Sequence, residues 1–233
     1  MRNIQARLDK AAKLAEQGHV EEARAIYEQV LTNRPRNTEA LYRLGVLHAA
    51  AGRQAEAVAM LERAASEKPE QLAYLHTLAR LHMDAGELTE AVNCYRRAAL
   101  VRPQHVHTHR LLGDALRLAG EPEEAVDSYR HALASIPYDP ELLTGLGLAL
   151  ADQGRLAEAH AVLLQAVAAE PEHAGCRAAL GRVMVMQGRL VDAVAVLESA
   201  AALEPENAAL RDEAGALRAR MENANPRTGT DDS

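Results

Sequence analysis

Four polar side chains near the middle of the sequence have the spacing of a single helical face. His107, Arg110, Asp114 and Arg117 follow one another at steps of three, four and three residues, which bring side chains together on an α-helix. Arginine presents a planar fork of N–H donors that binds a carboxylate through two hydrogen bonds. The spacing therefore predicts a surface for a carboxylate-bearing partner. The alternative is a charged face that meets only solvent.

A similar polar face lies earlier in the chain. His76, Arg80 and Met83 follow at steps of four and three residues, and Asp84 comes four residues after Arg80. The two faces together place three arginines and two histidines beside two aspartates. If these faces meet a partner, its carboxylates would pair with the three arginines.

The histidines are the obvious candidates for metal ligands, and their spacing argues against that role. His105, His107 and His109 alternate, and residues two apart on a helix point about 200° apart, so these three rings cannot meet at one ion. His48 and His82 occupy equivalent positions 34 residues apart. We expect them to be hydrogen-bonded interior side chains, and we predict no metal site.

The motifs of common catalytic sites do not occur in this sequence. Its regularly spaced glycines stand singly and form neither a phosphate-binding loop nor a dinucleotide fingerprint, and there is no nucleophile elbow. We therefore predict a protein that is not an enzyme, has no catalytic residues and needs no cofactor.

The two cysteines, Cys94 and Cys176, are expected to be free thiols that act as small buried apolar groups. Cys94 lies in the third and Cys176 in the sixth of the 34-residue repeats described below. Stacked helices are about 10 Å across, so three repeats of stacking would hold the two residues far beyond the roughly 7 Å Cα separation that a disulfide allows.

The elements that position these residues follow from a strict repeat. Glycines recur every 34 residues, at Gly18, Gly52, Gly86, Gly120, Gly154 and Gly188. Each is followed 17 residues later by a proline, at Pro35, Pro69, Pro103, Pro137, Pro171 and Pro205. An alanine lies at a constant offset between them, at Ala23, Ala57, Ala91, Ala125, Ala159 and Ala193. A fixed period of this length indicates a solenoid built from one supersecondary unit.

Each repeat is predicted to contain two helices. In residues 72–105 the first helix has an apolar face made by Leu75, Leu78, Ala79 and His82. Gly86 then closes that helix in a left-handed conformation. The second helix begins with acidic residues, which its dipole favours, and ends before Pro103. Its apolar face is made by Ala91, Cys94, Tyr95 and Ala98.

This pattern of paired helices resembles the tetratricopeptide repeat family. The family pattern of small and large residues is matched by Leu112, Gly113, Gly120, Ala125, Tyr129, Ala132 and Pro137. The match extends over about residues 4–207. The resemblance implies an all-α fold, a right-handed α-solenoid of six 34-residue helix-turn-helix repeats with a C-terminal capping helix.

The repeat register sets the expected domain boundaries. The repeats comprise residues 4–37, 38–71, 72–105, 106–139, 140–173 and 174–207. Residues 208–221 resemble a lone first helix with a polar outer side and are expected to cap a single solenoid of residues 1–221. Residues 222–233 offer no apolar face and are expected to form a disordered tail.

The resemblance also implies where a partner binds. The family holds extended or helical peptides in a concave groove lined by the first helices. One column of this groove would be Leu8, Tyr42, His76, Arg110, Thr144 and Ala178. Small Ala49, Ala151 and Ala178 would leave room for bulky partner side chains. The expected partner-binding residues are Tyr42, His76, Arg80, Met83, Asp84, His107, Arg110, Asp114 and Arg117.

Composition limits the other classes of partner. The 233 residues carry a formal net charge of −7, contain no Trp or Phe, and are 48% hydrophobic. A basic excess of the kind that binds nucleic acid is lacking. The sequence also contains no apolar stretch long enough for a signal peptide or a bilayer span, so we expect a cytoplasmic protein without a membrane partner.

Three functions are compatible with these observations. The first is a non-catalytic scaffold or adaptor that binds a protein or peptide segment with an acidic centre and apolar flanks. The second is a self-assembling scaffold, in which one copy docks into the groove of the next to form a homo-oligomer. The third is an accessory subunit that recruits substrate for a separate enzyme, such as a glycosyl- or sulfotransferase.

Overall fold

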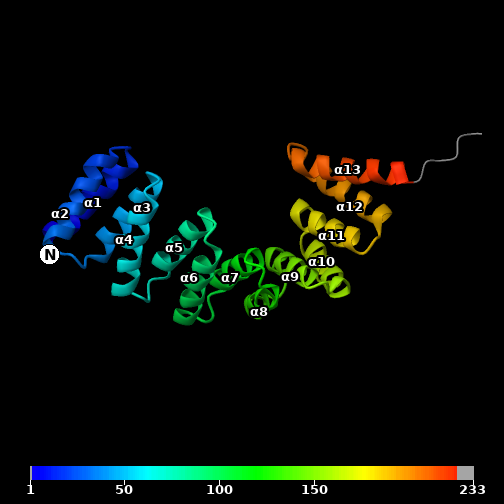
Figure 1. The fold of residues 1–233 in the computed structure, drawn as a ribbon, viewed down its shortest axis with the longest axis horizontal. Coiled ribbons are helices and arrows are strands. Elements are labelled where there is room, and N and C mark those ends of the chain that lie inside the picture. The colour runs from blue at the N-terminus through cyan, green and yellow to red at the C-terminus, as the bar shows by residue number, and fades with distance from the viewer. Residues whose placement is uncertain (1, 225–233) are drawn as a thin grey trace, which may run out of the picture. The chain divides into compact units, whose positions relative to one another are not determined.

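The computed structural model describes residues 2–224, and these residues form thirteen α-helices and no strand (Figure 1). The all-α fold expected from the repeat is confirmed. The chain divides into two compact units, residues 1–108 and residues 109–233, called here the N-terminal unit and the C-terminal unit. Within residues 2–224, no helix is both long and apolar enough to cross a bilayer.

The N-terminal unit consists of helices that pack in sequence order. They are α1 (Arg2–Glu16), α2 (Val20–Asn33), α3 (Thr38–Ala50), α4 (Gln54–Glu67), α5 (Leu72–Asp84), α6 (Leu88–Val101) and the start of α7 (Val106–Leu118). The pairs α1–α2, α3–α4 and α5–α6 pack together, and α2 and α4 also contact the first helix of the next pair. Each helix thus buries its apolar face against its neighbours in the sequence.

The C-terminal unit continues the same order. It contains the rest of α7, followed by α8 (Pro122–Leu133), α9 (Pro140–Asp152), α10 (Leu156–Ala169), α11 (Ala174–Met186), α12 (Leu190–Leu203) and α13 (Ala208–Ala224). Helix α13 packs on α12 and continues to Ala224, past the expected end at residue 221. The remainder of the predicted tail, residues 225–233, lies outside the described residues.

The recurring glycine closes the first helix of each pair. Gly86 has a φ of +76°, and its N–H donates to the carbonyl of Met83 at 3.0 Å while the N–H of Glu87 donates to the carbonyl of His82 at 2.9 Å. These bonds satisfy carbonyls that the helix end would otherwise leave without donors. The equivalent glycines in the other pairs also have positive φ.

Small residues allow the two helices of a pair to approach closely. A Cβ added at Gly113 on α7 would come within 2.8 Å of the Tyr129 ring on α8, and one added at Gly147 on α9 would come within 2.5 Å of Leu163 on α10. Gly145 on α9 also lies against the Tyr129 ring, so glycines of two helices flank this buried side chain. The helix spacing is therefore set by pairing one large side chain with a residue that has none.

Candidate partner-binding surfaces

A pocket of about 330 Å³ lies between α3 and α5 in the N-terminal unit. It contains two of the predicted binding residues, Arg80 and Asp84, together with Ala49. The complete lining is Val46, Ala49, Ala50, Gln54, Thr77, Arg80, Leu81 and Asp84. An apolar surface is thus bordered by one basic and one acidic side chain, an arrangement that suits an apolar partner side chain next to a charged one.

The charged residues of this pocket are exposed and weakly paired. The side chains of Arg80 and Asp84 are 70% and 67% exposed, and Arg80 Nη1 lies 3.9 Å from Asp84 Oδ2. An ion pair so open to solvent contributes little to stability. Breaking the contact between Arg80 and Asp84 would therefore cost little stability.

Aromatic contacts hold Tyr42 beside this pocket. Its ring packs on that of Tyr74 with centroids 5.0 Å apart, and its hydroxyl lies 3.3 Å from Oγ1 of Thr77, which lines the pocket. Met83, another predicted binding residue, is half-buried on α5. These contacts fix the orientation of the half-buried tyrosine at the pocket margin.

Three histidine rings gather next to α5, and they include His105 and His107, although residues two apart on a helix diverge. The ring of His76 lies 5.8 Å from that of His105 and 5.7 Å from that of His107, and His105 and His107 are 6.2 Å apart. The reason is that His105 precedes α7 and lies outside the helix. In the described residues, no group of three or more His, Cys, Asp or Glu is arranged to hold a metal ion.

A buried hydroxyl links two of these rings. The Nδ1 atom of His105 accepts the backbone N–H of Thr108 at 3.2 Å and therefore carries no proton. The Thr108 hydroxyl, 2.7 Å from the same nitrogen, donates to it and accepts Nε2–H of His76 at 2.9 Å. Burial, with the neighbouring His107 and His105, lowers the pKa of His76 to about 4. His76 is consequently a neutral packing residue at physiological pH.

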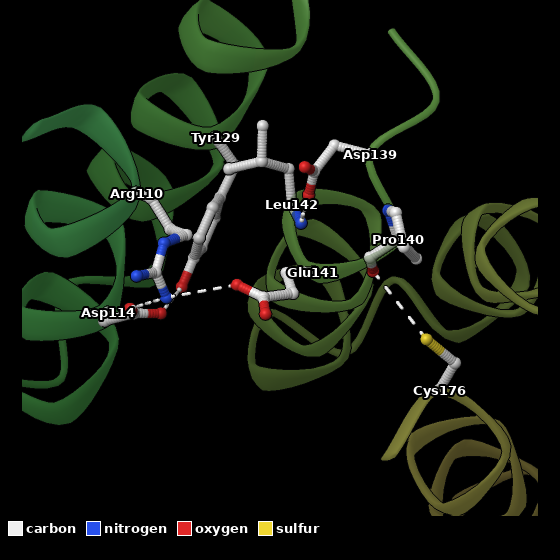
Figure 2. A network of polar contacts seen from close by, with 8 residues as sticks. All are labelled: Arg110, Asp114, Tyr129, Asp139, Pro140, Glu141, Leu142 and Cys176. Carbon is white, nitrogen blue, oxygen red and sulfur yellow. Dashed lines mark hydrogen bonds and ion pairs between the residues drawn. The ribbon is translucent and has the colours of Figure 1, made fainter. Parts of the chain in front are cut away.

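Two predicted residues of the C-terminal unit, Arg110 and Asp114 on α7, form a polar network with side chains of α8 and α9 (Figure 2). Arg110 Nη1 lies 3.8 Å from Asp114 Oδ2 and 3.4 Å from Glu141 Oε2. The hydroxyl of buried Tyr129 donates to Asp114 Oδ1 at 2.6 Å. Burial and the adjacent Asp114 carboxylate raise the pKa of Tyr129 well above its usual range. Asp114 is thus anchored to the core while it orients Arg110.

Arg117 is also paired within its own unit. Its Nη1 atom lies 2.9 Å from Asp152 Oδ2, and the two side chains are 29% and 41% exposed. Arg110 and Arg117 therefore already contact carboxylates of the chain. Among residues 2–224, the carboxylate contact of Arg80 is limited to its long one with Asp84. The sequence pattern presented these three arginines as equivalent, and their surroundings make them different.

The expected space beside small residues is present at one position and lacking at two. Ala49 lines the pocket, but Ala151 and Ala178 are 4% and 2% exposed and lie in the core. The groove column that contains Ala178 packs against the next first helix. Contacts of this kind join Tyr42 to Tyr74, His76 to Thr108, and Thr144 to Cys176. The prediction that Ala151 and Ala178 accommodate partner side chains was wrong, because neighbouring helices cover them.

The remaining histidines and cysteines have structural surroundings. Arg53 Nε donates to Nδ1 of His48 at 2.9 Å, and Nδ1 of His82 lies 2.6 Å from Oε2 of Glu87. The prediction that these two histidines are hydrogen-bonded is confirmed. Cys94 and Cys176 are buried free thiols, as expected, and burial raises the pKa of Cys94 to about 11.

Comparison with solved structures finds helical repeat proteins. TTC0263, a thermophilic TPR protein of Thermus thermophilus, is 27% identical with a TM-score of 0.60, covering 77% of this chain and 98% of its own. MamA of Desulfovibrio magneticus RS-1 is 19% identical with a TM-score of 0.64, covering 73% and 97%. YrrB, described as a TPR protein with an unusual peptide-binding site, is 17% identical with a TM-score of 0.62, covering 81% and 97%.

Family models give the same classification as the structural neighbours. No curated protein matches the sequence significantly. One tetratricopeptide repeat model matches residues 76–140, and another matches residues 14–78, 116–183 and 150–221. Since these matches together extend without a gap from residue 14 to residue 221, the chain belongs to the tetratricopeptide repeat family.

Proposed function

We propose that this protein is a non-catalytic scaffold that binds a peptide segment of a partner protein on the first helices of its repeats. The observation that carries the proposal is the pocket between α3 and α5, where apolar side chains adjoin the exposed Arg80. The structural neighbour YrrB, described as having a peptide-binding site, supports the class of ligand. The absence of catalytic motifs from the sequence supports a role without enzymatic activity or cofactor.

The partner segment carries a carboxylate next to an apolar side chain. The carboxylate pairs with Arg80 and displaces Asp84, whose contact with Arg80 is long and exposed. The apolar side chain packs on Val46, Ala49 and Leu81 in the pocket. In the same unit, the flanking residues of the segment meet Tyr42, His76, Met83 and His107.

Arg110, Asp114 and Arg117 provide a second contact in the C-terminal unit. A partner carboxylate there exchanges with Glu141 or Asp152, which already pair with the two arginines. Because that exchange breaks existing ion pairs, the second contact contributes less affinity than Arg80. We place this binding in the cytoplasm, with no membrane or nucleic acid as partner.

Selection from a displayed library of short random peptides tests the proposal. We expect enriched sequences to contain Asp or Glu beside a large apolar residue. Changing Arg80→Glu should weaken the binding of an enriched peptide by about tenfold or more, because a charge-assisted hydrogen bond becomes a repulsion. Arg110→Glu and Arg117→Glu should each weaken it less.

A matched variant controls for a change in net charge. Arg43 is an exposed arginine on α3 that does not line the pocket, so Arg43→Glu should leave peptide affinity unchanged. Circular dichroism establishes that each variant remains helical. If Arg80→Glu binds the selected peptide as tightly as the parent while remaining folded, this site is not the binding surface.

A further inference from the structure

The proline-containing connections between repeats change charge from one unit to the other. In the N-terminal unit they read Arg34-Pro-Arg, Lys68-Pro-Glu and Arg102-Pro-Gln, after α2, α4 and α6 (Figure 1). In the C-terminal unit they read Ile136-Pro-Tyr, Glu170-Pro-Glu and Glu204-Pro-Glu, after α8, α10 and α12. All of these residues are exposed. We call Arg34, Lys68 and Arg102 the basic edge, and Glu170, Glu172, Glu204 and Glu206 the acidic edge.

Two residues of the basic edge lie close together in the N-terminal unit. Arg34 and Lys68 line the same pocket of about 450 Å³, which places two successive connections side by side. Among residues 2–224, the side chains of Arg34, Lys68 and Arg102 have neither a hydrogen bond nor an ion pair. Arg36, by contrast, lies 3.3 Å from Glu67. Within the part of the chain that the structure describes, the basic edge therefore presents three cations that form no ion pair.

The acidic edge also forms no ion pair with the described residues. Within the described residues, Glu170, Glu172, Glu204 and Glu206 make no ion pair, and Glu204 accepts one hydrogen bond from Asn207 at 2.9 Å. The connections leave successive helix pairs at the same register, and repeats place such connections on one face of a solenoid. At the position before the proline, Glu170 and Glu204 thus carry the opposite charge to the three residues of the basic edge. At the position after it, the C-terminal unit has Glu172 and Glu206, and the N-terminal unit has one acidic residue, Glu70.

Local helix stability explains the basic edge but not all of the acidic one. Arg34, Lys68 and Arg102 are C-terminal caps, where the helix dipole favours a cation. Glu170 and Glu204 occupy this same cap position on α10 and α12, where the dipole disfavours an anion. A surface that attracts cations gives these two carboxylates a role that capping does not.

We infer that the acidic edge of one copy of this chain binds the basic edge of a second copy, forming a head-to-tail self-association. The two edges are opposite in charge and exposed, and they lie in the equivalent connections of the repeat. This interface is separate from the peptide pocket between α3 and α5, and neither proposal depends on the other. Because the contact is between exposed charges, it is weak and sensitive to salt.

Sedimentation velocity on the full chain tests this inference. In about 0.1 M NaCl the mean mass should rise above the 25.2 kDa of one chain as concentration increases, and in about 1 M NaCl, where the screening length falls to about 3 Å, it should return to that value. A mass of one chain at every concentration in low salt would overturn the inference. Association that persists in high salt would also overturn it, because apolar contacts would then hold the copies together.

Two charge reversals identify the interface. The first variant carries Arg34→Glu, Lys68→Glu and Arg102→Glu, so both of its edges are acidic. The second carries Glu170→Lys, Glu172→Lys, Glu204→Lys and Glu206→Lys, so both are basic. Each alone should remain monomeric, and an equimolar mixture should associate at least as strongly as the parent chain. Failure of the folded variants to associate when mixed would contradict edge-to-edge pairing.

A control separates edge position from net charge. Lys10, Lys13 and Arg43 are exposed cations of the N-terminal unit that lie outside the proline connections. The variant Lys10→Glu, Lys13→Glu and Arg43→Glu changes net charge by the same amount as the first variant. It should retain the self-association of the parent chain. Loss of association in this control would mean that overall charge, and not the basic edge, governs the contact.

Discussion

The two units share one repeat pattern and differ in how they use charge. Residues 1–108 carry 15 Lys and Arg against 13 Asp and Glu, a net charge of +2, whereas residues 109–233 carry 11 against 20, a net charge of −9. The arginines differ as well, since Arg80 is exposed and weakly paired while Arg110 and Arg117 contact carboxylates of their own unit. The same helical face thus serves as an open surface in one unit and a self-paired one in the other.

The largest expected effect concerns the tyrosine that fills the gap between paired helices. Tyr27 and Tyr129 occupy equivalent positions in the two units and are almost completely buried. Tyr129→Ala should lower the free energy of unfolding by about 3–5 kcal/mol, because a large cavity forms. For Tyr129→Ala, hydrogen exchange should show reduced protection of backbone amides mainly in α7–α9. For Tyr27→Ala, the reduced protection should lie mainly in α1–α3. Equal loss in both units from either change would show that they do not unfold separately.

The hydroxyl of the same tyrosine should matter in only one unit. Tyr129 donates to Asp114, whereas Tyr27 makes no side-chain hydrogen bond with the described residues. Tyr129→Phe should therefore cost about 1.5–3 kcal/mol, the range for a hydrogen bond to a charged group. Tyr27→Phe should change stability by less than about 0.5 kcal/mol. Urea denaturation of the two variants measures the difference, and equal effects would contradict a structural role for the Tyr129–Asp114 bond.

Acid should affect the N-terminal unit through His76. Its folded-state pKa of about 4 lies below the ordinary value of 6.5, so between these values the unfolded chain binds more protons. This contribution to stability is present above pH 6.5 and is lost as pH falls towards 4. The difference between the two pKa values corresponds to at most about 3.4 kcal/mol, and solvent around the half-buried ring reduces the expected loss to about 2 kcal/mol. The measurement is the pH dependence of urea unfolding.

A substitution distinguishes His76 from the other titrating groups. His76→Gln keeps an N–H donor for Thr108 but removes the titrating ring, so the variant should lose stability less steeply between pH 6.5 and 4. His19→Gln is the control, because the His19 side chain is 56% exposed. An unchanged pH profile for His76→Gln would show that the ring is not held neutral.

The smallest effect compares arginines of the two units. Arg117→Ala removes a close and partly buried ion pair with Asp152 and should lower stability by about 1 kcal/mol. Arg80→Ala removes only a long, exposed contact and should change it by less than about 0.5 kcal/mol. Thermal unfolding of both variants provides the measurement. A larger loss for Arg80→Ala would mean that Arg80 is structural and not available to a partner.

Much of the fold could be predicted because backbone chemistry leaves a clear signal in sequence. Gly86 follows the end of α5, and Pro103 follows the end of α6. The helix predicted for residues 72–85 is α5, Leu72–Asp84. His105 was less predictable. It precedes α7, and its ring accepts the N–H of Thr108 as a cap. An imidazole is an uncommon capping group, so the two-residue spacing from His107 predicts a helical position instead.

The candidate site was predictable only in part. The steps between residues correctly grouped Arg110 and Asp114, which lie 3.8 Å apart, but could not reveal that Tyr129 donates to Asp114 or that Glu141 approaches Arg110. Nor could they distinguish Ala49, which lines a pocket, from Ala151, which is buried. Spacing describes one helix, whereas pairing and burial depend on the helices that pack against it.

The sequence by itself determined that this protein is a series of helix pairs, because glycine and proline act on the backbone at the positions where they occur. It also determined the reversal of charge along the exposed proline connections, since those residues have few neighbours to alter their exposure. Only the tertiary structure decided which arginine remains exposed and weakly paired and which small residues are covered. These properties depend on atoms from separate helices that come together when the chain folds, and no local pattern records them.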